Sequence, residues 1–315
     1  MKKGTKIALG TLVGFIVMVL VIAAGPFYMV EVRGDKSFVL SGNSSGEVVK
    51  KDPLADQKQA WKKVDNKQDV ALTTKDGTHL KGQYIPAAKK TNKTAVMIHG
   101  FGVDHTEMIP YANLMHDQGY NVLLSDNRAA GKSEGSFIGY GYLEAKDYLE
   151  WIDKLIDDNP NSEIVVYGTS LGGATTMLLS GMNPPKQVKA FIEDCGYTSM
   201  REELVYEANT LFGIPKWVAN PLISVMSVYS KILAGYSYNQ VDSVAAVKKN
   251  DRPMLFIHGD EDNFVPGYMV HDVYDAAKGP KEKMVVAGAD HMEAYRLDIP
   301  KYEHKVESFL DKYMD

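Results

Sequence analysis

Residues 163–182 read EIVVYGTSLGGATTMLLSGM, and this stretch decides the fold. Its first residues are apolar and β-branched, as in a buried strand, and its last residues are compatible with a helix. Between them lies the pattern G-x-S-x-G, which places Ser170 on a sharp turn from strand to helix. Gly168 and Gly172 suit this turn because it leaves no room for side chains. The sequence therefore predicts that the Ser170 hydroxyl projects at the carboxyl end of a sheet.

Strand-like and helix-like segments alternate around this turn from residue 70 onward. This alternation predicts an α/β fold with a mostly parallel central sheet flanked by helices. The first two strands differ, because the Asp-Gly turn at residues 76–77 predicts an antiparallel hairpin. The predicted strands are residues 70–74, 80–85, 94–99, 121–125, 163–167, 188–192, 254–258 and 284–287. The predicted helices lie near residues 106–118, 141–158, 171–182, 267–277 and 301–313.

The interval between Asp194 and Met254 is longer than the roughly 2 to 6 residues that usually connect such elements. Apolar and aromatic residues recur through it, so we expect a small helical cap inserted at about residues 197–240. Pro215 and Pro221 are expected to break its helices. The alternative is an ordinary helix pair that completes the core.

A serine hydroxyl is a weak nucleophile and needs a base that a third group orients. Among the eight histidines, His291 is the best candidate, because it follows the last predicted strand at the carboxyl edge of the sheet. The segment after the preceding strand offers Asp260, Glu261 and Asp262 as the acid. We favour Asp262, since Asp260 lies close enough to the strand end to brace the loop. Glu261 is the weakest candidate.

Three other histidines lie near predicted strand ends. His99 and His258 each precede a glycine at the end of an apolar strand and are interpreted as structural residues. His105 lies just beyond the loop after His99, so a role facing the substrate is an alternative to a structural one.

Charge that develops on a carbonyl oxygen needs preorganised donors. The backbone N–H of Leu171, directly after the serine, is one predicted donor. Phe101, in the glycine-flanked loop HGFG at residues 99–102, is predicted to supply the second. This loop lacks the lysine and the spacing of a P-loop, so it does not favour phosphate binding.

The composition excludes several classes of function. The chain carries 35 basic and 40 acidic side chains, with a formal net charge of -5, and no basic cluster interleaved with aromatics, so we expect no nucleic-acid partner. Cys195 is the only cysteine, which rules out an intrachain disulfide and a cysteine-rich metal site. We interpret it as a small buried hydrophobe. No H-E-x-x-H or paired-histidine spacing occurs, and we expect no metal and no cofactor.

The amino-terminal segment predicts a membrane anchor. Residues 7–30 contain no charged side chain and would extend roughly 36 Å as a helix, against about 30 Å for a bilayer core. Lys2, Lys3 and Lys6 precede them, so the positive-inside tendency predicts a single-pass protein of the cell membrane with an extracytoplasmic catalytic domain. A cleaved signal peptide, with Ala23 and Gly25 near the processing site, is the alternative.

These patterns divide the chain into an anchor at residues 1–30, a spacer and leading segment at 31–69, and a catalytic domain at 70–315. Residues 41–46 read SGNSSG, a composition that favours flexible backbone. Basic residues around Trp61 predict an amphipathic helix with a solvated face. No pattern in the chain predicts its oligomeric state.

These ordered motifs resemble those of the α/β-hydrolase family, and in particular membrane-anchored bacterial cell-surface hydrolases of the esterase and serine-aminopeptidase-like branch. The resemblance covers residues 70–315 and rests on HGFG at 99, DNRAAGKSEG at 126, GTSLG at 168, GDEDNFVP at 259 and DH at 290. It implies a catalytic triad, an oxyanion hole and a cap between the sixth and seventh strands. The implied triad is Ser170, Asp262 and His291, and the implied oxyanion hole is formed by Phe101 and Leu171.

Two positions depart from the family pattern. Ala129 stands where the pattern D-x-R-G-x-G-x-S has its first glycine, although Asp126, Arg128, Gly131 and Ser133 match. Asp290 replaces a small residue common in relatives, and it is expected either to raise the basicity of the neighbouring histidine or to face solvent.

Together the motifs predict a metal-independent serine hydrolase that cleaves carboxylic esters through an acyl-enzyme intermediate. An amide or peptide hydrolase with the same triad is one alternative, and a non-catalytic, membrane-tethered binding module is another. The expected partners are a small-molecule ester or amide and the membrane that holds the amino-terminal helix. Phe101, Phe212 and Trp217 are predicted to contact an apolar or aromatic part of the substrate.

Overall fold

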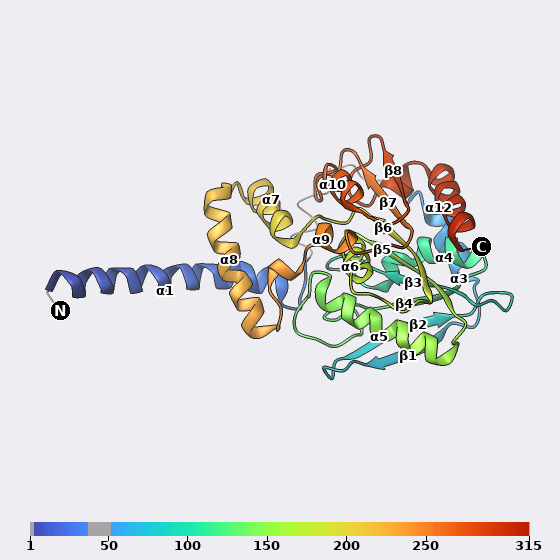
Figure 1. Ribbon diagram of the computed structural model, residues 1–315, viewed down its shortest axis with the longest axis horizontal. Coiled ribbons are helices and arrows are strands. Elements are labelled where there is room, and N and C mark those ends of the chain that lie inside the picture. The colour runs from blue at the N-terminus through green and yellow to red at the C-terminus, as the bar shows by residue number, and fades with distance from the viewer. Residues whose placement is uncertain (1–2, 37–51, 315) are drawn as a thin grey trace.

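The computed structural model describes residues 3–36 and 52–314 (Figure 1). A single eight-stranded sheet forms its centre, in the order β1-β2-β4-β3-β5-β6-β7-β8. The predicted α/β class is confirmed, and the strands differ from the predicted ranges only at their ends. They are β1 (Gln68–Thr73), β2 (His79–Ile85), β3 (Lys93–Ile98), β4 (Asn121–Ser125), β5 (Glu163–Thr169), β6 (Val188–Asp194), β7 (Met254–Gly259) and β8 (Lys281–Val286).

The direction of the strands determines where the loops gather. β1 and β2 form the predicted antiparallel hairpin, β2 pairs antiparallel with β4, and all further neighbours are parallel. Strands β3 to β7 are buried almost throughout, which explains their continuous apolar sequences. Because these strands run in parallel, the loops that follow β3, β5 and β7 meet at one edge of the sheet.

Helices cover both faces of the sheet. On one face, α5, α6, α9 and α10 enclose a core that includes Trp151 and Phe256, and on the other α3, α4 and α12 pack around Tyr111 and Phe309. Trp61 of α3 is buried, with its ring 6.1 Å from that of His116. These elements are α3 (Ala55–Lys62), η1 (His105–Met108), α4 (Ile109–Asp117), α5 (Tyr142–Asp158), α6 (Leu171–Ser180), η2 (Tyr238–Gln240), α9 (Ser243–Val247), α10 (Met269–Ala276), α11 (Ala294–Leu297) and α12 (Ile299–Met314).

Two helices, α7 (Met200–Phe212) and α8 (Lys216–Leu233), occupy the interval in which the sequence predicts a cap. Pro215 immediately precedes α8, as expected of a residue that ends one helix and begins the next. The prediction that Pro221 breaks a helix is wrong, because Pro221 lies inside α8. Its ring removes one hydrogen bond near the exposed amino end, and the packing of α8 on α1 and α7 maintains the rest of the helix.

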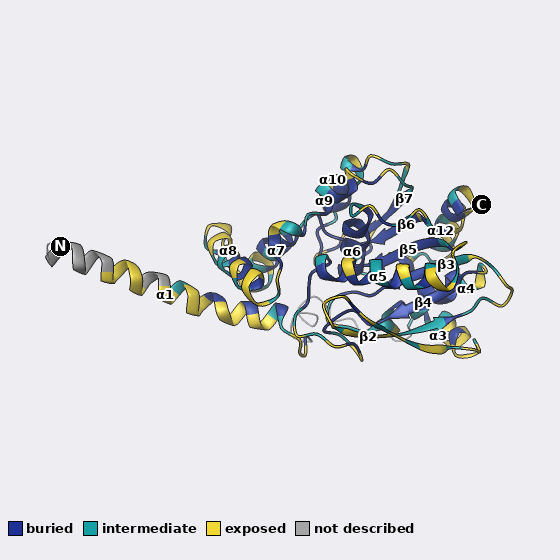
Figure 2. Ribbon diagram, turned by 60° about the horizontal axis from the view of Figure 1, so that its bottom comes forward, coloured by how far each residue is buried: buried dark blue, intermediate teal, exposed yellow. Residues whose placement is uncertain are grey.

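The amino-terminal helix α1 (Lys3–Glu31) projects from the sheet domain (Figure 1). Its part Gly10–Glu31 is long and apolar enough to cross a membrane by length and composition, and most of its described surface is exposed (Figure 2). The carboxyl end differs, since Ala23 and Phe27 are buried and Arg33 donates its backbone N–H to Ser136. The predicted flexible spacer at residues 41–46 lies outside the described residues.

Gly172 is expected to tolerate no side chain. A Cβ at this position would lie 2.0 Å from the carbonyl oxygen of Ile98, so α6 could not pack against β3. We expect Gly172→Ala to lower the free energy of unfolding by at least about 3 kcal/mol, measured by thermal or urea unfolding. Gly34→Ala is the matched control, because a Cβ at Gly34 would have no neighbour within 4 Å among the described residues. Equal stability of the two variants would show that this contact is not required.

Candidate active site

Ser170 occupies the turn between β5 and α6. Its φ of 55° and ψ of -119° lie in a region that residues with a side chain rarely adopt, and such backbone strain is common at functional sites. The Ser170 N–H donates to the carbonyl of Asp194 on β6, at 2.8 Å. A Cβ at Gly168 would lie 2.0 Å from the carbonyl oxygen of Gly172, which explains the glycine on each side of the serine.

Two loops bring an acid and a base to this serine. His291 follows β8, and its Nε2 lies 2.9 Å from the Ser170 Oγ. Its Nδ1 lies 2.8 Å from Oδ2 of Asp262, which follows β7. The Phe264 ring packs on the imidazole with centroids 4.9 Å apart. The structure therefore joins the three residues of the predicted triad in one hydrogen-bonded chain.

The Asp262 carboxylate is buried and held from several sides. Its Oδ1 accepts the backbone N–H groups of Phe264 and Val265 at 2.9 and 2.8 Å. Burial raises the pKa of Asp262, but the charge of His291 and hydrogen bonds from His291 and His258 outweigh it and lower the pKa to about 2. The carboxylate is thus charged at neutral pH, as a group that orients a base should be.

His258 is a second histidine at this carboxylate that the sequence analysis did not connect with it. Its Nε2 lies 3.2 Å from Oδ2 of Asp262 and 2.9 Å from the carbonyl of Val265. The two residues are four positions apart in sequence, and this spacing across the end of β7 was the available signal. His258 is fully buried, in agreement with its interpretation as a structural residue.

The other acids of these loops fix the backbone. Oδ1 of Asp260 accepts the N–H of Gly288 at 2.6 Å, which joins the loop after β7 to the loop after β8. Oδ1 of Asp290 accepts the N–H groups of Asn263 and His291. Asp290 therefore connects the loops that carry the acid and the base.

The loop after β3 lies directly against the serine. Oε2 of Glu107 accepts the Gly100 N–H at 2.8 Å, and a Cβ at Gly100 would stand 3.4 Å from the Ser170 Cβ. Phe101 follows in this loop. Leu171 is the first residue of α6. Its backbone N–H therefore has no acceptor within the helix. The two predicted oxyanion donors thus belong to two segments that adjoin Ser170, the loop after β3 and the start of α6.

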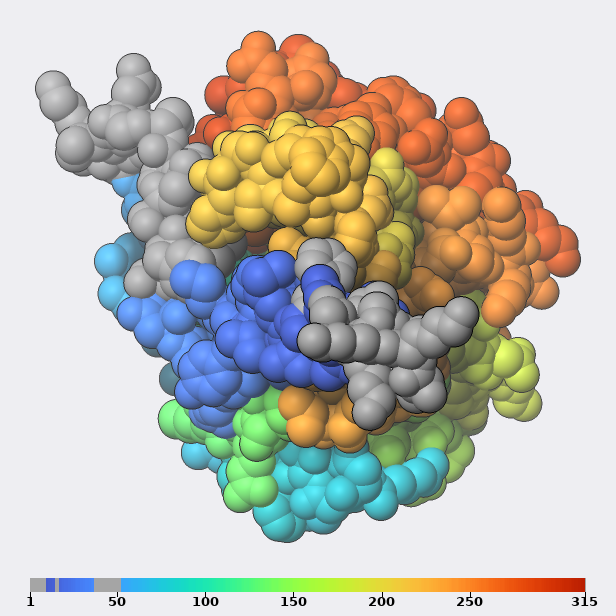
Figure 3. All heavy atoms as spheres, turned by 90° about the vertical axis from the view of Figure 1, so that its left-hand side faces the viewer, coloured from blue at the N-terminus to red at the C-terminus, as the bar shows by residue number. Residues whose placement is uncertain are grey.

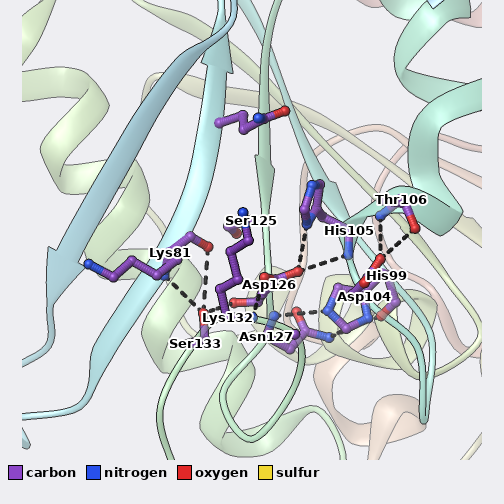
Figure 4. A network of polar contacts seen from close by, with 12 residues as sticks. Lys81, His99, Asp104, His105, Thr106, Ser125, Asp126, Asn127, Lys132 and Ser133 are labelled. Atoms are coloured by element: carbon purple, nitrogen blue, oxygen red, sulfur yellow. Dashed lines mark hydrogen bonds and ion pairs between the residues drawn. The ribbon is translucent and has the colours of Figure 1, made fainter.

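A polar network holds this loop to the turn after β4 (Figure 4). Oδ1 of Asp126 accepts the backbone N–H of His105 and also lies 2.7 Å from Nδ1 of the His105 ring. Oδ2 of Asp126 accepts the backbone N–H of Lys132. Nε2 of His99 accepts the Asn127 N–H at 2.9 Å, and burial lowers the pKa of His99 to about 4, which keeps the ring neutral. His105 is therefore engaged with Asp126, and the alternative of a substrate-facing role is not supported.

Ala129 lies in the same turn with a φ of 58°, a conformation that favours glycine. Its N–H donates to the carbonyl of Glu134 at 2.8 Å, so the turn that the family pattern describes forms despite the departure from glycine.

Among the described residues, two groups of side chains have the spacing of metal ligands, Cys195 with Asp262 and His291, and Asp104 with His105 and Asp126. In each group the histidine is already hydrogen-bonded to an aspartate, and Asp104 accepts hydrogen bonds from Thr106. Burial raises the pKa of the Cys195 thiol, which favours the protonated form that is a poor metal ligand. Both groups are accounted for as hydrogen-bonded networks.

A cavity of about 220 Å³ opens beside Ser170, beneath the cap. Phe101 and Phe212 line it as predicted, whereas Trp217 is 79% exposed on the outside of α8 and does not contact it. Residues from α1, both cap helices and the loops after β3 and β7 contribute to the lining. They are Pro26, Met29, Val30, Phe101, Tyr140, Ser170, Leu171, Tyr197, Glu203, Leu204, Glu207, Ala208, Leu211, Phe212, Ile214, Ile223, Met226, Phe264 and Val265.

Glu203 and Glu207 of α7 are the unexpected members of this lining. They are 7% and 8% exposed, and their four carboxyl oxygens have no hydrogen-bond partner among the described residues. Burial raises the pKa of Glu203 and raises that of Glu207 to about 8. Burial therefore favours the neutral, protonated form of both side chains. Their spacing of four residues places them on one helix face, but the sequence does not show that this face is buried.

The fold, the nucleophile turn and the hydrogen-bonded chain define the class of protein: this is an α/β hydrolase of the esterase and peptidase type. A family model described as serine aminopeptidase, S33, matches residues 89–252. The chain belongs to that family of serine hydrolases.

The chain is similar to other proteins in sequence and in fold. The chain is 29% identical to the protein YqkD of Bacillus subtilis over 241 residues, which covers 76% of this chain and 77% of YqkD. The esterase Pf2001 of Pyrococcus furiosus is similar in structure, with a TM-score of 0.65, 23% identity, and coverage of 79% of this chain and 93% of the esterase. The acylaminoacyl peptidase of Pyrococcus horikoshii gives 0.59, with 18% identity and coverage of 81% and 42%. These two structures share the fold.

The buried pair on α7 predicts a stability that falls as pH rises. Below its ordinary pKa of 4.5, Glu207 is protonated in both the folded and the unfolded chain, so burial has no ionisation cost. Between pH 4.5 and about 8 the unfolded chain loses this proton and the folded chain retains it, which favours unfolding. We expect Glu207→Gln to raise Tm more at pH 8 than at pH 5. The exposed Glu307→Gln serves as control, and an equal effect of both variants at both pH values would contradict the assignment.

Proposed function

We propose that this protein hydrolyses carboxylic esters by forming an acyl-enzyme intermediate on Ser170. The observation that carries the proposal is the chain from Ser170 through His291 to Asp262, with contacts of 2.9 and 2.8 Å, at the mouth of an apolar cavity. A serine, a base and an orienting acid in this geometry are the elements of nucleophilic acyl transfer.

In this mechanism His291 Nε2 takes the proton of the Ser170 hydroxyl as Oγ bonds to the ester carbonyl carbon. The backbone N–H groups of Phe101 and Leu171 stabilise the oxyanion. The imidazolium, which Asp262 stabilises, then gives its proton to the departing alcohol. In the second half, water gives a proton to His291 as its oxygen bonds to the acyl carbon. The bond from this carbon to Ser170 Oγ then breaks, and the imidazolium returns its proton to Oγ as the acid leaves.

The amide alternative uses the same residues and is supported by the family description and by the likeness to an acylaminoacyl peptidase. We favour esters because the lining is mainly hydrocarbon, and burial raises the pKa of its two carboxyl groups, Glu203 and Glu207, which favours their neutral form. A peptide would leave backbone N–H and C=O groups without partners in such a cavity. The binding-module alternative leaves the strain at Ser170 without a purpose.

We further propose that α1 spans the cell membrane, with Lys2, Lys3 and Lys6 on the cytoplasmic side and the hydrolase domain on the other. The length and composition of Gly10–Glu31 support a span, and the cationic residues before it support this orientation. Phe101 and Phe212 would contact the acyl part of the substrate.

The nucleophile is tested by Ser170→Ala. We expect kcat/KM for p-nitrophenyl esters to fall by at least about 10⁴-fold, because the variant has no atom to form the acyl-enzyme. Wild type should react covalently with a fluorophosphonate, and the variant should not. An amide panel assayed alongside separates the ester from the amide proposal. Retained turnover in Ser170→Ala, with an unchanged fold, would refute the mechanism.

The acid is tested by a matched pair of variants in one loop. Asp262→Asn should lower kcat by about 10³- to 10⁴-fold, because the amide no longer holds the histidine in the required tautomer. Asp260→Asn should keep kcat within about threefold, since Oδ1 of Asp260 accepts the Gly288 N–H, a hydrogen bond that an amide oxygen can also accept. The reverse order of effects would exchange the roles of the two aspartates.

A further inference from the structure

The sheet domain and the cap do not complete the wall of the Ser170 cavity. Pro26, Met29 and Val30, in the last turns of α1, line it together with residues of α7 and α8. We propose that this end of α1 forms part of the acyl-binding wall, and that the substrate is a long-chain ester taken from the membrane that α1 spans. The inference rests on the proposed esterase function and adds the class and the source of the substrate.

Hydrogen bonds fix this end of α1 relative to the cavity. The Tyr140 hydroxyl donates to the carbonyl of Val30 at 3.0 Å. The N–H of Ile138 donates to the carbonyl of Glu31 at 2.8 Å. Tyr140 also lines the cavity, and its ring stacks on that of Phe101 with centroids 5.8 Å apart. One aromatic side chain therefore connects the end of the anchor to the loop beside the nucleophile.

The cap helix α8 crosses α1 well before the end of α1 (Figure 1). The Tyr229 hydroxyl donates to the carbonyl of Leu20 at 2.8 Å, and its ring meets Phe27 edge-on with centroids 5.6 Å apart. Leu20 precedes Val30 by about 15 Å along the helix axis, at 1.5 Å per residue. A span that extends to Glu31 thus places the contact between α8 and α1 within the bilayer and not above it.

The outward surface of α8 suits this position. Trp217 and Ile232 are 79% and 72% exposed, and Val228 is exposed between them. Figure 3 shows the cap gathered around the emerging anchor, on the face from which α1 leaves the domain. An exposed apolar helix face that carries a tryptophan is suited to contact with lipid.

Apolar side chains of both α1 and α8 line the cavity that contains Ser170. An acyl chain drawn from the leaflet beside these helices would contact this hydrocarbon while its ester lies at Ser170. Since the chain moves from one apolar environment to another, little hydrophobic free energy opposes the transfer. A short soluble ester would leave the α1 wall without a contact, so long chains are the preferred substrates.

The wall is tested in the full chain, reconstituted into vesicles of phosphatidylcholine and phosphatidylglycerol. Met29→Trp should lower kcat/KM for p-nitrophenyl palmitate at least about tenfold, because each methylene kept out of the cavity costs about fourfold. Activity on the acetate ester should fall less, so that the ratio of palmitate to acetate activity decreases. Tyr28→Trp is the matched control, since Tyr28 is 68% exposed on the same helix and outside the lining. An unchanged chain-length profile in Met29→Trp, or an equal change in both variants, would overturn the proposal.

The source of the substrate is tested with a fluorogenic long-chain diacylglycerol ester. We expect its hydrolysis to be more than tenfold faster when it is in the vesicles that hold the protein than in separate vesicles. Trp217→Ser with Ile232→Ser should lower the rate in shared vesicles, whereas Leu297→Ser, an exposed leucine outside the cap, should not. Equal rates in shared and separate vesicles would exclude entry from the membrane.

Fluorophosphonate labelling separates failure of this inference from failure of the proposed function. A wild type that is labelled and cleaves the acetate ester, but whose chain-length profile is unaffected by Met29→Trp, retains the function and refutes the role of α1. A wild type that is neither labelled nor active on any ester refutes both.

Discussion

The turn at Ser170 depends on contact between backbones at van der Waals limits, and the rest of the site depends on that turn. β5 lies between β3 and β6, and α6 can begin directly after it only where Gly172 meets the carbonyl of Ile98 without a side chain. This approach holds the serine in a backbone conformation that is disfavoured by about 1 to 3 kcal/mol, and the buried packing of α6 between the sheet and α5 offsets the strain. The same approach brings the loop after β3 beside the hydroxyl.

Asp262 is the second fixed point, because its two oxygens serve different purposes. One oxygen accepts two backbone N–H groups and shapes its own loop, and the other faces both His291 and His258. Asp290 and Asp260 then join this loop to the one that carries the base. The acid, the base and their loops thus form one hydrogen-bonded unit across the ends of β7 and β8.

The sequence pattern was sufficient to predict the elements whose structure depends on residues that are neighbours in the chain. Buried parallel strands have continuous apolar sequences, and a serine between two glycines after such a strand has few alternatives, so the sheet and the convergence of Ser170, Asp262 and His291 could be predicted. The participation of Met29 in the cavity and the burial of Glu203 and Glu207 depend on which helix faces meet in space, and a single sequence does not encode these faces visibly. The predictions for Pro221 and Trp217 are wrong for the same reason, since the neighbours of α8 decide that the helix continues and that the indole lies outside the cavity.

The hydrogen bonds between the end of α1 and the domain give the proposed anchor a mechanical meaning. The sequence places the boundary between anchor and spacer after residue 30. In the structure, hydrogen bonds to Tyr140, Ile138 and Ser136 hold the chain in place at this boundary. A span clamped in this way cannot change its tilt without turning the whole domain. Bilayers of different thickness tilt a span of fixed length to different degrees. The thickness of the host membrane would therefore set the angle at which the mouth of the cavity meets the lipid.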